Sequence, residues 1–317
     1  MSAPAPRQAD RPGRALVERL AFPVVLCAAV LVNQAELRAG ADPTASSGVA
    51  IFGTMLIVGL LERLYPQYHA WLRSHRDVPT DIAHALTIGT LAGALTPALT
   101  LAGIAAADWL NGRLGVGLWP TSWPWLAQLP LALVAAELPK YWHHRLTHEV
   151  PLLWRYHALH HSAPRLYFLN AARFHPIDIA IDTSVGLAFI LVLGCPVEVI
   201  ALLGTVSAVH GYFQHANLRT RIGWLNYVFS MAELHRWHHS RKLEEANHNY
   251  GQNVIFWDLV FGTFYWPRDR EPPEAIGLPG LAAFPMTYLR QLASPFTFGR
   301  IRRASEGQAD DPSRAAV

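Results

Sequence analysis

The chain has 317 residues, of which 51% are hydrophobic and only 15% are charged, whereas about a quarter of the residues in an average soluble protein are charged. This shortage of charge argues against an ordinary cytosolic enzyme. The formal net charge is only +3 and the arginines are scattered between apolar runs and in the tails, so no nucleic-acid partner is expected. Both cysteines lie inside apolar runs, which supports neither a disulfide framework nor a thiolate metal site.

Residues 1–20 form a polar, basic N-terminal tail, which is followed by the apolar stretch Ala21–Val32. A signal peptide is the alternative interpretation of this stretch. The polar region before it is long and further apolar runs follow, which favours a retained membrane anchor. Because the stretch is short for a bilayer and ends in Asn33 and Gln34, we expect it to tilt or to lie partly in the interface.

Three further apolar runs, Gly48–Leu64, Ile82–Leu110 and Trp123–Trp142, are typical of membrane spans. Pro97 is expected to kink the second of them or to split it into a re-entrant pair. The third begins with clustered tryptophans, which favour a membrane interface.

A last apolar run, Ile179–Val209, is interrupted at Gly194-Cys195-Pro196, which predicts two helices that enter and leave the membrane on one side. The segment Glu62–Asp81 carries three arginines, more than the loops on either side of it. By the positive-inside rule, the N-terminus, this segment and the chain just after Trp142 are cytoplasmic. Both histidine-rich flanks of the last run then face the cytoplasm.

These patterns predict an all-α protein, a polytopic integral membrane helical bundle with a cytoplasmic histidine-rich metal-binding cap. We expect transmembrane helices over residues 21–129, a C-terminal cytoplasmic segment over 267–303 and a disordered tail over 304–317. The expected location is a membrane that the chain crosses several times, the inner or cell membrane if the source is bacterial.

Histidine is over-represented, since the chain has 16 and 12 of them fall between His143 and His239. Three short arrays have metal-ligand spacing, because residues three or four apart share one face of a helix. They contain eight candidate ligands, which are His144, His148, His157, His160, His161, His235, His238 and His239. Imidazoles near a bilayer are costly unless they have partners, which favours a functional interpretation.

Two more histidines, His175 and His215, are candidates either to bind a metal or to support a ligand. His210 lies five residues before His215, so the two diverge on an ideal helix and cannot share a metal. His143 is adjacent to His144 and cannot face the same ion, which favours a structural role. Four isolated histidines are expected at interfaces or helix ends, namely His69, His75, His84 and His248.

Eight or more imidazoles exceed what one ion can accept, so the arrays imply two metals. Imidazole binds iron, zinc, copper and nickel, but a histidine-only pair of sites near a bilayer fits iron, which can activate O₂ and attack an unactivated C–H bond. Zinc offers no redox chemistry. Four carboxylates could orient the ligands through their second ring nitrogens or could be solvated charges at helix ends, namely Glu137, Glu149, Asp178 and Glu233.

Taken together, these motifs resemble the fatty acid hydroxylase/sterol desaturase superfamily over about residues 130–266. The segments that carry the resemblance are Tyr-Trp-x-His-Arg-x-x-His at 141–148, Leu-Trp-Arg-Tyr-His-x-x-His-His-Ser at 153–162, Arg-Phe-His-Pro at 173–176, Phe-x-His-x-Asn at 213–217, His-Arg-Trp-His-His-Ser at 235–240, Asn-Tyr-Gly at 249–251 and Trp-Asp-x-x-Phe-Gly-Thr at 257–263. Each motif is weak alone and their combination is specific. Residues 130–266 are therefore expected to form a catalytic domain like that of the family.

The resemblance implies an integral membrane enzyme with a histidine-ligated centre of two iron ions, Fe²⁺/Fe³⁺, in which zinc can appear on isolation. Such an enzyme uses O₂ and two electrons to hydroxylate or desaturate a sterol, fatty acyl or related lipid. The implied metal ligands are His144, His148, His157, His160, His161, His175, His215, His235, His238 and His239. No further catalytic residue is predicted, and the spacing of His210 and His215 departs from the further pair usual in the family.

Two other functions compete with a lipid oxygenase. A membrane zinc-dependent hydrolase would use the same histidines, but the arrays lack a His-Glu-x-x-His element. A non-enzymatic metal-binding membrane protein would carry ionisable residues in the middle of several spans if it transported ions. Because the chain has no dinucleotide fingerprint, an oxygenase would need a separate electron donor, such as a ferredoxin, a cytochrome b5-like protein or a reductase.

Overall fold

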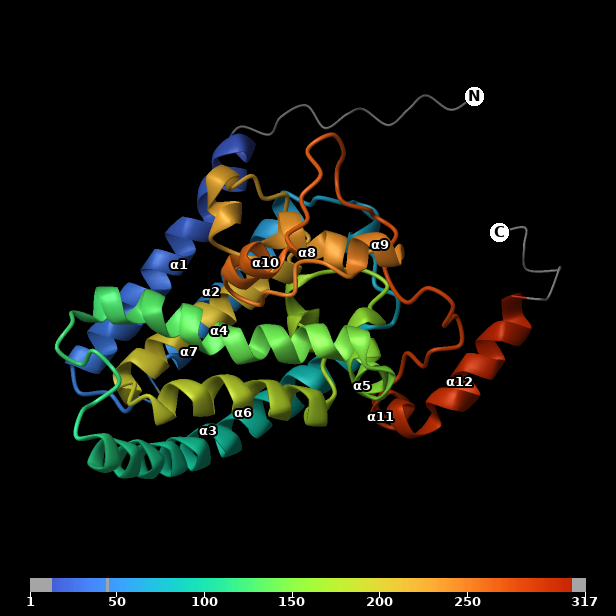
Figure 1. Cartoon of the computed structure of the whole chain (residues 1–317). Helices are drawn as coiled ribbons and strands as arrows, with labels where there is room; N and C mark the ends of the chain where they lie inside the picture. Colours follow the sequence, from blue (N-terminus) through green and yellow to red (C-terminus); the bar gives the residue numbers. More distant parts are fainter. Residues whose placement is uncertain (1–12, 44–45, 310–317) are drawn as a thin grey trace.

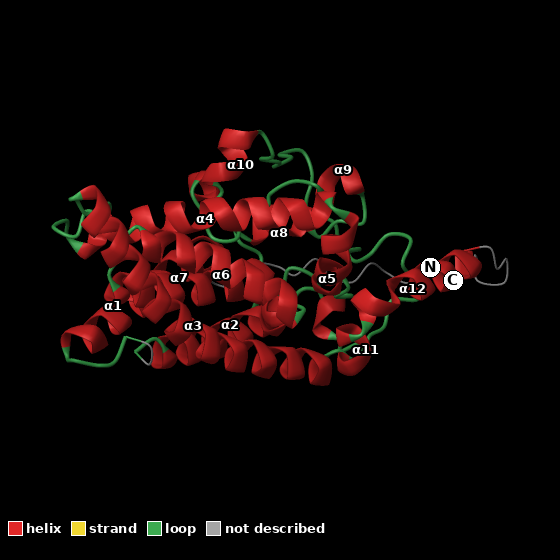
Figure 2. Ribbon diagram, turned by 60° about the horizontal axis from the view of Figure 1, so that its bottom comes forward, coloured by secondary structure: helices red, strands yellow, loops and turns green. Residues whose placement is uncertain are grey.

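The computed structural model describes residues 13–43 and 46–309. Over these residues the secondary structure is helical, with isolated β-bridges but no strand. Figure 2 accordingly shows helices joined by loops. The predicted all-α class is confirmed for the described part of the chain.

An elongated bundle of long helices forms the larger part of the molecule (Figure 1). Its members are α1 (Arg14–Arg38), α2 (Gly48–Leu64), α3 (Val78–Leu114), α4 (Trp125–Glu149), α6 (Pro176–Val192) and α7 (Val197–His215). Helix α6 packs against both α3 and α4, while α7 packs against α1 and α2. Apolar residues fill these contacts, such as Ile190 and Leu191 of α6, both almost fully buried.

Shorter elements connect and cover the bundle. They are α5 (Pro151–His161), α8 (Ala232–His238), α9 (Leu243–Ala246), α10 (Phe256–Phe261), α11 (Tyr288–Leu292), α12 (Ser294–Ala309) and the 3₁₀ helices η1 (Ala70–Leu72), η2 (Phe168–Ala172) and η3 (Gly223–Tyr227). In Figure 1, α8, α9 and α10 lie above α4, and α12 extends away from the bundle. The histidine arrays therefore lie where the bundle meets these covering elements.

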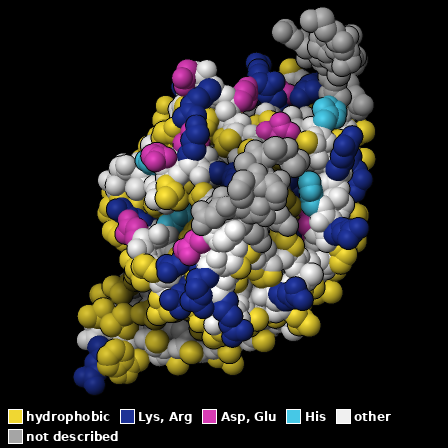
Figure 3. All heavy atoms as spheres, turned by 90° about the vertical axis from the view of Figure 1, so that its right-hand side faces the viewer, with side chains coloured by type: hydrophobic (Ala, Val, Ile, Leu, Met, Phe, Trp, Pro, Cys, Tyr) yellow, Lys and Arg dark blue, Asp and Glu magenta, His cyan; other side chains and the backbone are white. Residues whose placement is uncertain are grey.

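Two of the described helices, α1 and α3, are long and apolar enough to cross a membrane, with mean hydropathies of 2.2 and 1.6 in their most apolar windows. Only 22% and 6% of these windows, respectively, is buried inside the protein, whereas the core helix of a soluble domain is mostly buried. Large apolar side chains such as Leu86, Leu101 and Trp109 of α3 are exposed. Hydrophobic side chains also gather along the lower edge of the face in Figure 3, the level at which α3 lies in Figure 1. Exposed apolar surface of this kind suits contact with lipid.

The ends of several elements differ from the sequence predictions. Helix α1 begins at Arg14, inside the predicted polar tail, where Arg14 and Glu18 pair one turn apart. Helix α3 continues through Pro97 to Leu114, so of the two effects expected of Pro97, a kink or a split into a re-entrant pair, the split is wrong. A proline removes one backbone donor, and the regular turns on both sides of Pro97 hold the helix together.

The predicted interruption of the last apolar run is confirmed, because α6 ends at Val192 and α7 begins at Val197. Gly194 has a φ of 89°, a conformation that favours glycine, and Pro196 precedes the first turn of α7. At the other end of the chain, residues 304–309 belong to helix α12 and not to the predicted disordered tail. Helix α12 pairs Arg302 with Glu306 one turn apart. The rest of the predicted tail, 310–317, lies outside the described residues.

Candidate metal centre

Nine histidines converge in two adjoining groups. Within each group the possible ligand nitrogens all lie within 4.8 Å of one another. Group one contains His144, His148, His157, His161 and His238, and group two contains His160, His215, His235 and His239. The groups are neighbours, since the rings of His161 and His239 have their centroids 4.5 Å apart.

Local sequence explains why the helices meet here. Pro151 prevents α4 from continuing past Glu149, so the chain turns and starts α5 at once. The last turns of α4 and the histidines of α5 are thereby brought face to face. Helices α7 and α8 add the remaining members, because α7 ends at His215 and α8 ends at His238.

Group one presents five bare ring nitrogens. The Nε2 atoms of its five histidines are buried and have no hydrogen-bond partner among the described residues. A buried polar atom without a partner costs about 1–3 kcal/mol, so five of them in one place are unfavourable without a ligand. A cation at their centre would satisfy all five.

Group two is more crowded. The Nε2 atom of His235 lies 3.0 Å from Nε2 of His215 and 2.9 Å from Nε2 of His239. The Nδ1 atom of His215 donates to Oδ1 of Asn170 over 3.1 Å, so its Nε2 atom carries a lone pair. A cation between the three nitrogens would satisfy their lone pairs together.

Several rings are oriented by acceptors on their far side. His144 donates from Nδ1 to the carbonyl oxygen of Tyr250 over 2.6 Å, and His238 donates to that of His248 over 2.9 Å. His157 donates to Oδ2 of Asp178 over 2.9 Å. Each of these bonds fixes the proton on Nδ1 and leaves Nε2 free, as a metal-binding imidazole requires.

Burial keeps the rings neutral. Desolvation lowers the pKa well below its usual value in the six members that lie outside the long bundle helices, namely His157, His160, His161, His235, His238 and His239. Neighbouring imidazoles lower the pKa further, since a charged ring would repel the others. Neutral imidazole is the form that binds metals, so the donor set fits two metal ions.

Seven histidines lie outside the two groups, and three of these belong to the histidine-rich part of the sequence, namely His143, His175 and His210. His175 uses both ring nitrogens, because Nδ1 accepts from the backbone N–H of Ile177 and Nε2 donates to the carbonyl of Leu292. It caps the start of α6 and has no lone pair left for a metal, in contrast to the ligand role predicted for it. His210 packs against Phe22, and His143 lies outside both groups, close to the carboxylate of Asp178.

Among the four candidate carboxylates, Asp178 contacts a histidine of the groups. The other three have partners that do not belong to the groups. Glu137 accepts backbone N–H groups of the 252–253 segment, Glu149 pairs with Arg145 at the surface, and Glu233 accepts the N–H of Ile222. Asp178 is therefore the one described carboxylate of the four that orients a ring.

Replacing Asp178 with asparagine is expected to lower metal affinity and activity by about 10- to 100-fold, because outer contacts of this kind have effects of that size. The amide oxygen still accepts from His157 but carries no charge. Metal content by mass spectrometry checks this expectation. Asp108→Asn, the same change at an exposed carboxylate of α3, is expected to leave metal content unchanged. Equal losses in the two variants would contradict the role of Asp178.

Sequence reasoning missed the side chain of Asn170 and the three backbone carbonyls that orient the rings. Asn170 lies in η2 and is buried, and its amide also donates to the carbonyl of Arg165. The Asn-Tyr-Gly motif at 249–251 was a usable signal, because Asp258 accepts the N–H groups of Tyr250 and Gly251 and so holds the carbonyl that His144 contacts.

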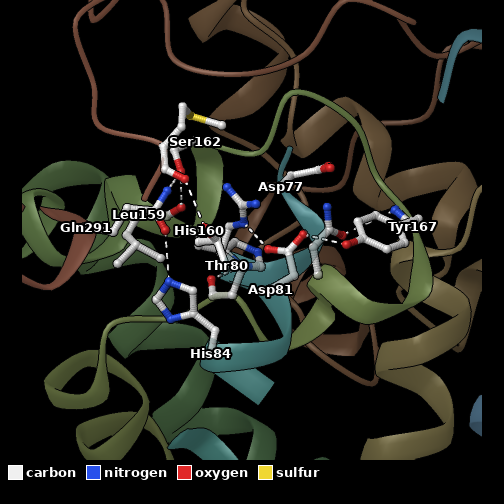
Figure 4. Close-up of polar contacts among 12 residues, drawn as sticks. Asp77, Thr80, Asp81, His84, Leu159, His160, Ser162, Tyr167 and Gln291 are labelled. Atoms are coloured by element: carbon white, nitrogen blue, oxygen red, sulfur yellow. Dashed lines mark hydrogen bonds and ion pairs between the residues drawn. The ribbon is translucent and has the colours of Figure 1, made fainter. Parts of the chain in front are cut away.

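A buried polar network supports group two from the side of α3. The Nδ1 atom of His160 donates to the carbonyl of Arg173 over 3.2 Å, and the guanidinium of Arg173 pairs with Asp81 at 2.6 Å. Figure 4 shows Asp81 also facing the hydroxyl of Tyr167, which donates to it over 2.7 Å. Arg173 and Asp81 are both fully buried, so they depend on each other for charge compensation.

Replacing Asp81 with alanine is expected to destabilise the protein by about 3–5 kcal/mol, because a buried guanidinium would lose its carboxylate. Thermal unfolding of the purified protein in detergent measures the effect. Asp108 lies on the same helix and is exposed, so Asp108→Ala is the control and should unfold close to the native chain. Equal unfolding temperatures for the two variants would show that the pair adds no stability.

Group one lies next to a cavity of about 740 Å³, whose wall includes His148 and His161. Apolar side chains such as Trp154, Leu281 and Phe298 form much of the remaining lining. The charged residues Arg302 and Glu306 of α12 also line it. The cavity therefore combines apolar walls, charged groups and direct access to two histidines.

Comparison with known proteins gives the context of this site. A family model described as fatty acid hydroxylase matches residues 129–263, the stretch that contains both groups. Over 286 residues the chain is 38% identical to an ornithine lipid hydroxylase, OlsE, of Rhizobium tropici, which covers 89% of this chain and 85% of that protein.

More distant relatives match about half of the chain. An alkylglycerol monooxygenase of Homo sapiens is 30% identical over 156 residues, covering 49% of this chain and 34% of the human protein. A methylsterol monooxygenase of Arabidopsis thaliana is 28% identical over 143 residues, covering 43% of this chain and 52% of the plant protein. No solved structure matches the chain.

Proposed function

Because this chain belongs to the fatty acid hydroxylase family and is an oxidoreductase, we propose that it is an O₂-dependent membrane lipid hydroxylase with a di-iron centre. The family expected from the motifs is confirmed by these matches. The observation that carries the proposal is the convergence of nine imidazoles in two adjoining groups, eight of them buried and that of His148 half-buried. A purely structural role would not require five bare Nε2 atoms in one group.

Each group would hold one iron. Group one offers five imidazoles and group two offers four, and histidine nitrogen is a usual ligand of iron. The ligand set proposed here contains nine of the ten histidines predicted from sequence and leaves out His175. Bound iron would supply the activation of O₂ and the attack on an unactivated C–H bond, which protein side chains alone do not perform.

The chain itself would hold, orient and shield this centre. The carboxylate of Asp178 and the carbonyls of Tyr250, Arg173 and His248 fix the rings through Nδ1. Burial shields group two from water, since its four rings are all buried. Rigid support of this kind aligns one C–H bond of the substrate, which accounts for much of the rate that an enzyme contributes.

The substrate would approach through the cavity lined by His148 and His161. Its apolar walls suit a hydrocarbon segment, whereas Arg302 and Glu306 suit a polar headgroup of either charge. The relative from Rhizobium tropici is named for an ornithine lipid, which combines both features. We therefore propose a lipid with a charged headgroup as the substrate class.

The proposal includes a membrane setting. Helices α1 and α3 would cross the bilayer, with α2, α4, α6 and α7 completing a multi-pass bundle, and the metal centre would lie on the cytoplasmic side. The arginine-rich segment Glu62–Asp81 supports this orientation. Electrons would come from a separate donor, a ferredoxin, a cytochrome b5-like protein or a reductase.

High-resolution mass spectrometry of total lipids tests the function. Matched cells expressing the native chain or its His238→Ala variant are grown in air, and a lipid heavier by about one oxygen atom is expected with the native chain alone. Loss of two hydrogens from a lipid would indicate desaturation. Turnover under strict anaerobiosis would overturn the proposal and favour a zinc hydrolase built on the same histidines.

A further inference from the structure

A second cavity, of about 480 Å³, lies where the start of α1 meets the loops around α8. The backbone joins these segments, because the N–H of Arg221 donates to the carbonyl of Glu18 over 2.8 Å. Figure 1 shows the start of α1 beside the loops that surround α8 and α10. Six arginines line the cavity against two glutamates, which are Glu233 and Glu271.

Arg236 is the most deeply placed of these arginines. Only 2% of it is exposed, and one of its terminal nitrogens donates to the carbonyls of Ala216 and Leu218, both over 2.7 Å. Its Nε atom is buried and has no partner among the described residues. A buried guanidinium with an unused donor is costly unless an anion reaches it.

Three of the other arginines already have carboxylate partners. Arg219 pairs with Glu271, and two more pairs join Arg221 to Glu18 and Arg270 to Glu245. Among the described residues, no carboxylate lies within ion-pair distance of Arg19, Arg236 or Arg268. Arg268 instead stacks on Trp266, with its guanidinium carbon 3.2 Å from the ring centroid. Glu233 and Glu271 offset part of this charge, but the six arginines of the lining outnumber them and positive charge remains in excess around the cavity.

We propose that this cavity binds a phosphoryl group. Guanidinium groups match phosphate oxygens in geometry, and several of them converging in a hollow suit a compact anion better than the broad surface of an acidic protein. Arg19 lies just before the apolar part of α1, so the phosphate of a membrane phospholipid is within reach, as is free phosphate from solution. The site is separate from the cavity at His148 and does not depend on the proposed lipid oxidation.

Binding to the whole purified chain in a phosphate-free maltoside detergent tests the site. Native mass spectrometry measures binding of dioleoyl phosphatidylglycerol, with dioleoylglycerol as the lipid that lacks phosphate, and calorimetry measures inorganic phosphate. The test variants are Arg19→Glu and Arg268→Glu at the rim of the cavity. Arg73→Glu, an exposed arginine elsewhere, is the matched control.

We expect at least one phosphate probe to bind and each test variant to weaken it at least tenfold, whereas Arg73→Glu stays within twofold of the native chain. Binding of phosphatidylglycerol that inorganic phosphate displaces identifies a lipid source, and binding of inorganic phosphate alone identifies a soluble one. Equal binding of dioleoylglycerol, or unchanged binding in the test variants, overturns the proposal. It is also overturned if neither phosphate probe binds the native chain.

Discussion

Replacement of His238 by alanine is expected to abolish lipid oxidation, with a loss well above the hundredfold upper limit that is usual for outer contacts of a metal site. The ring of His238 belongs to group one, is fully buried and has its Nε2 atom bare. Its removal takes one of five nitrogens from the proposed iron. Metal analysis of the purified variant should show a loss of about one iron per chain, while the amount of membrane-inserted protein stays the same.

His175→Ala is the matched control, because His175 is also a buried histidine in a motif of the family but lies outside both groups. It loses the cap of α6, which costs about 1 kcal/mol of stability. Iron content and activity should stay close to native. Full activity in His238→Ala, or equal iron loss in both variants, would remove His238 from the metal centre.

The convergence of the arrays could be predicted because metal-ligand spacing is local. His144 and His148 lie one turn apart on α4, and that spacing alone places them on one face. The division into two groups was also within reach of sequence reasoning. In each doublet, His160-His161 and His238-His239, one member belongs to each group, since adjacent residues on a helix point in different directions.

Other features depend on contacts that the sequence does not display. His175 stands in a motif shared with the family, yet Pro176 starts a helix directly after it and the ring is used as a cap. Asn170 orients His215 across 45 residues of chain, a pairing that no local pattern indicates. Pro97 lies inside a continuous helix, although a proline removes one backbone hydrogen-bond donor.

Replacement of His215 by alanine is expected to empty group two, with loss of about one iron per chain and of lipid oxidation. The Nδ1 atom of His215 is held by Asn170, and its Nε2 atom lies 3.0 Å from that of His235. Without this oriented nitrogen, the remaining three rings of group two would hold iron more weakly. Iron content per chain and oxidation of the lipid identified in cells measure the effect.

His210→Leu is the control on the same helix, five residues away. Both ring nitrogens of His210 are buried without a partner among the described residues, and the ring packs against Phe22 and Phe229. An apolar side chain of similar size removes two unsatisfied polar atoms, so stability should stay the same or rise. Since His210 belongs to neither group, the iron content of His210→Leu should equal that of the native chain. Iron loss in His210→Leu, or its retention in His215→Ala, would mean that α7 supplies a different ligand to the second metal.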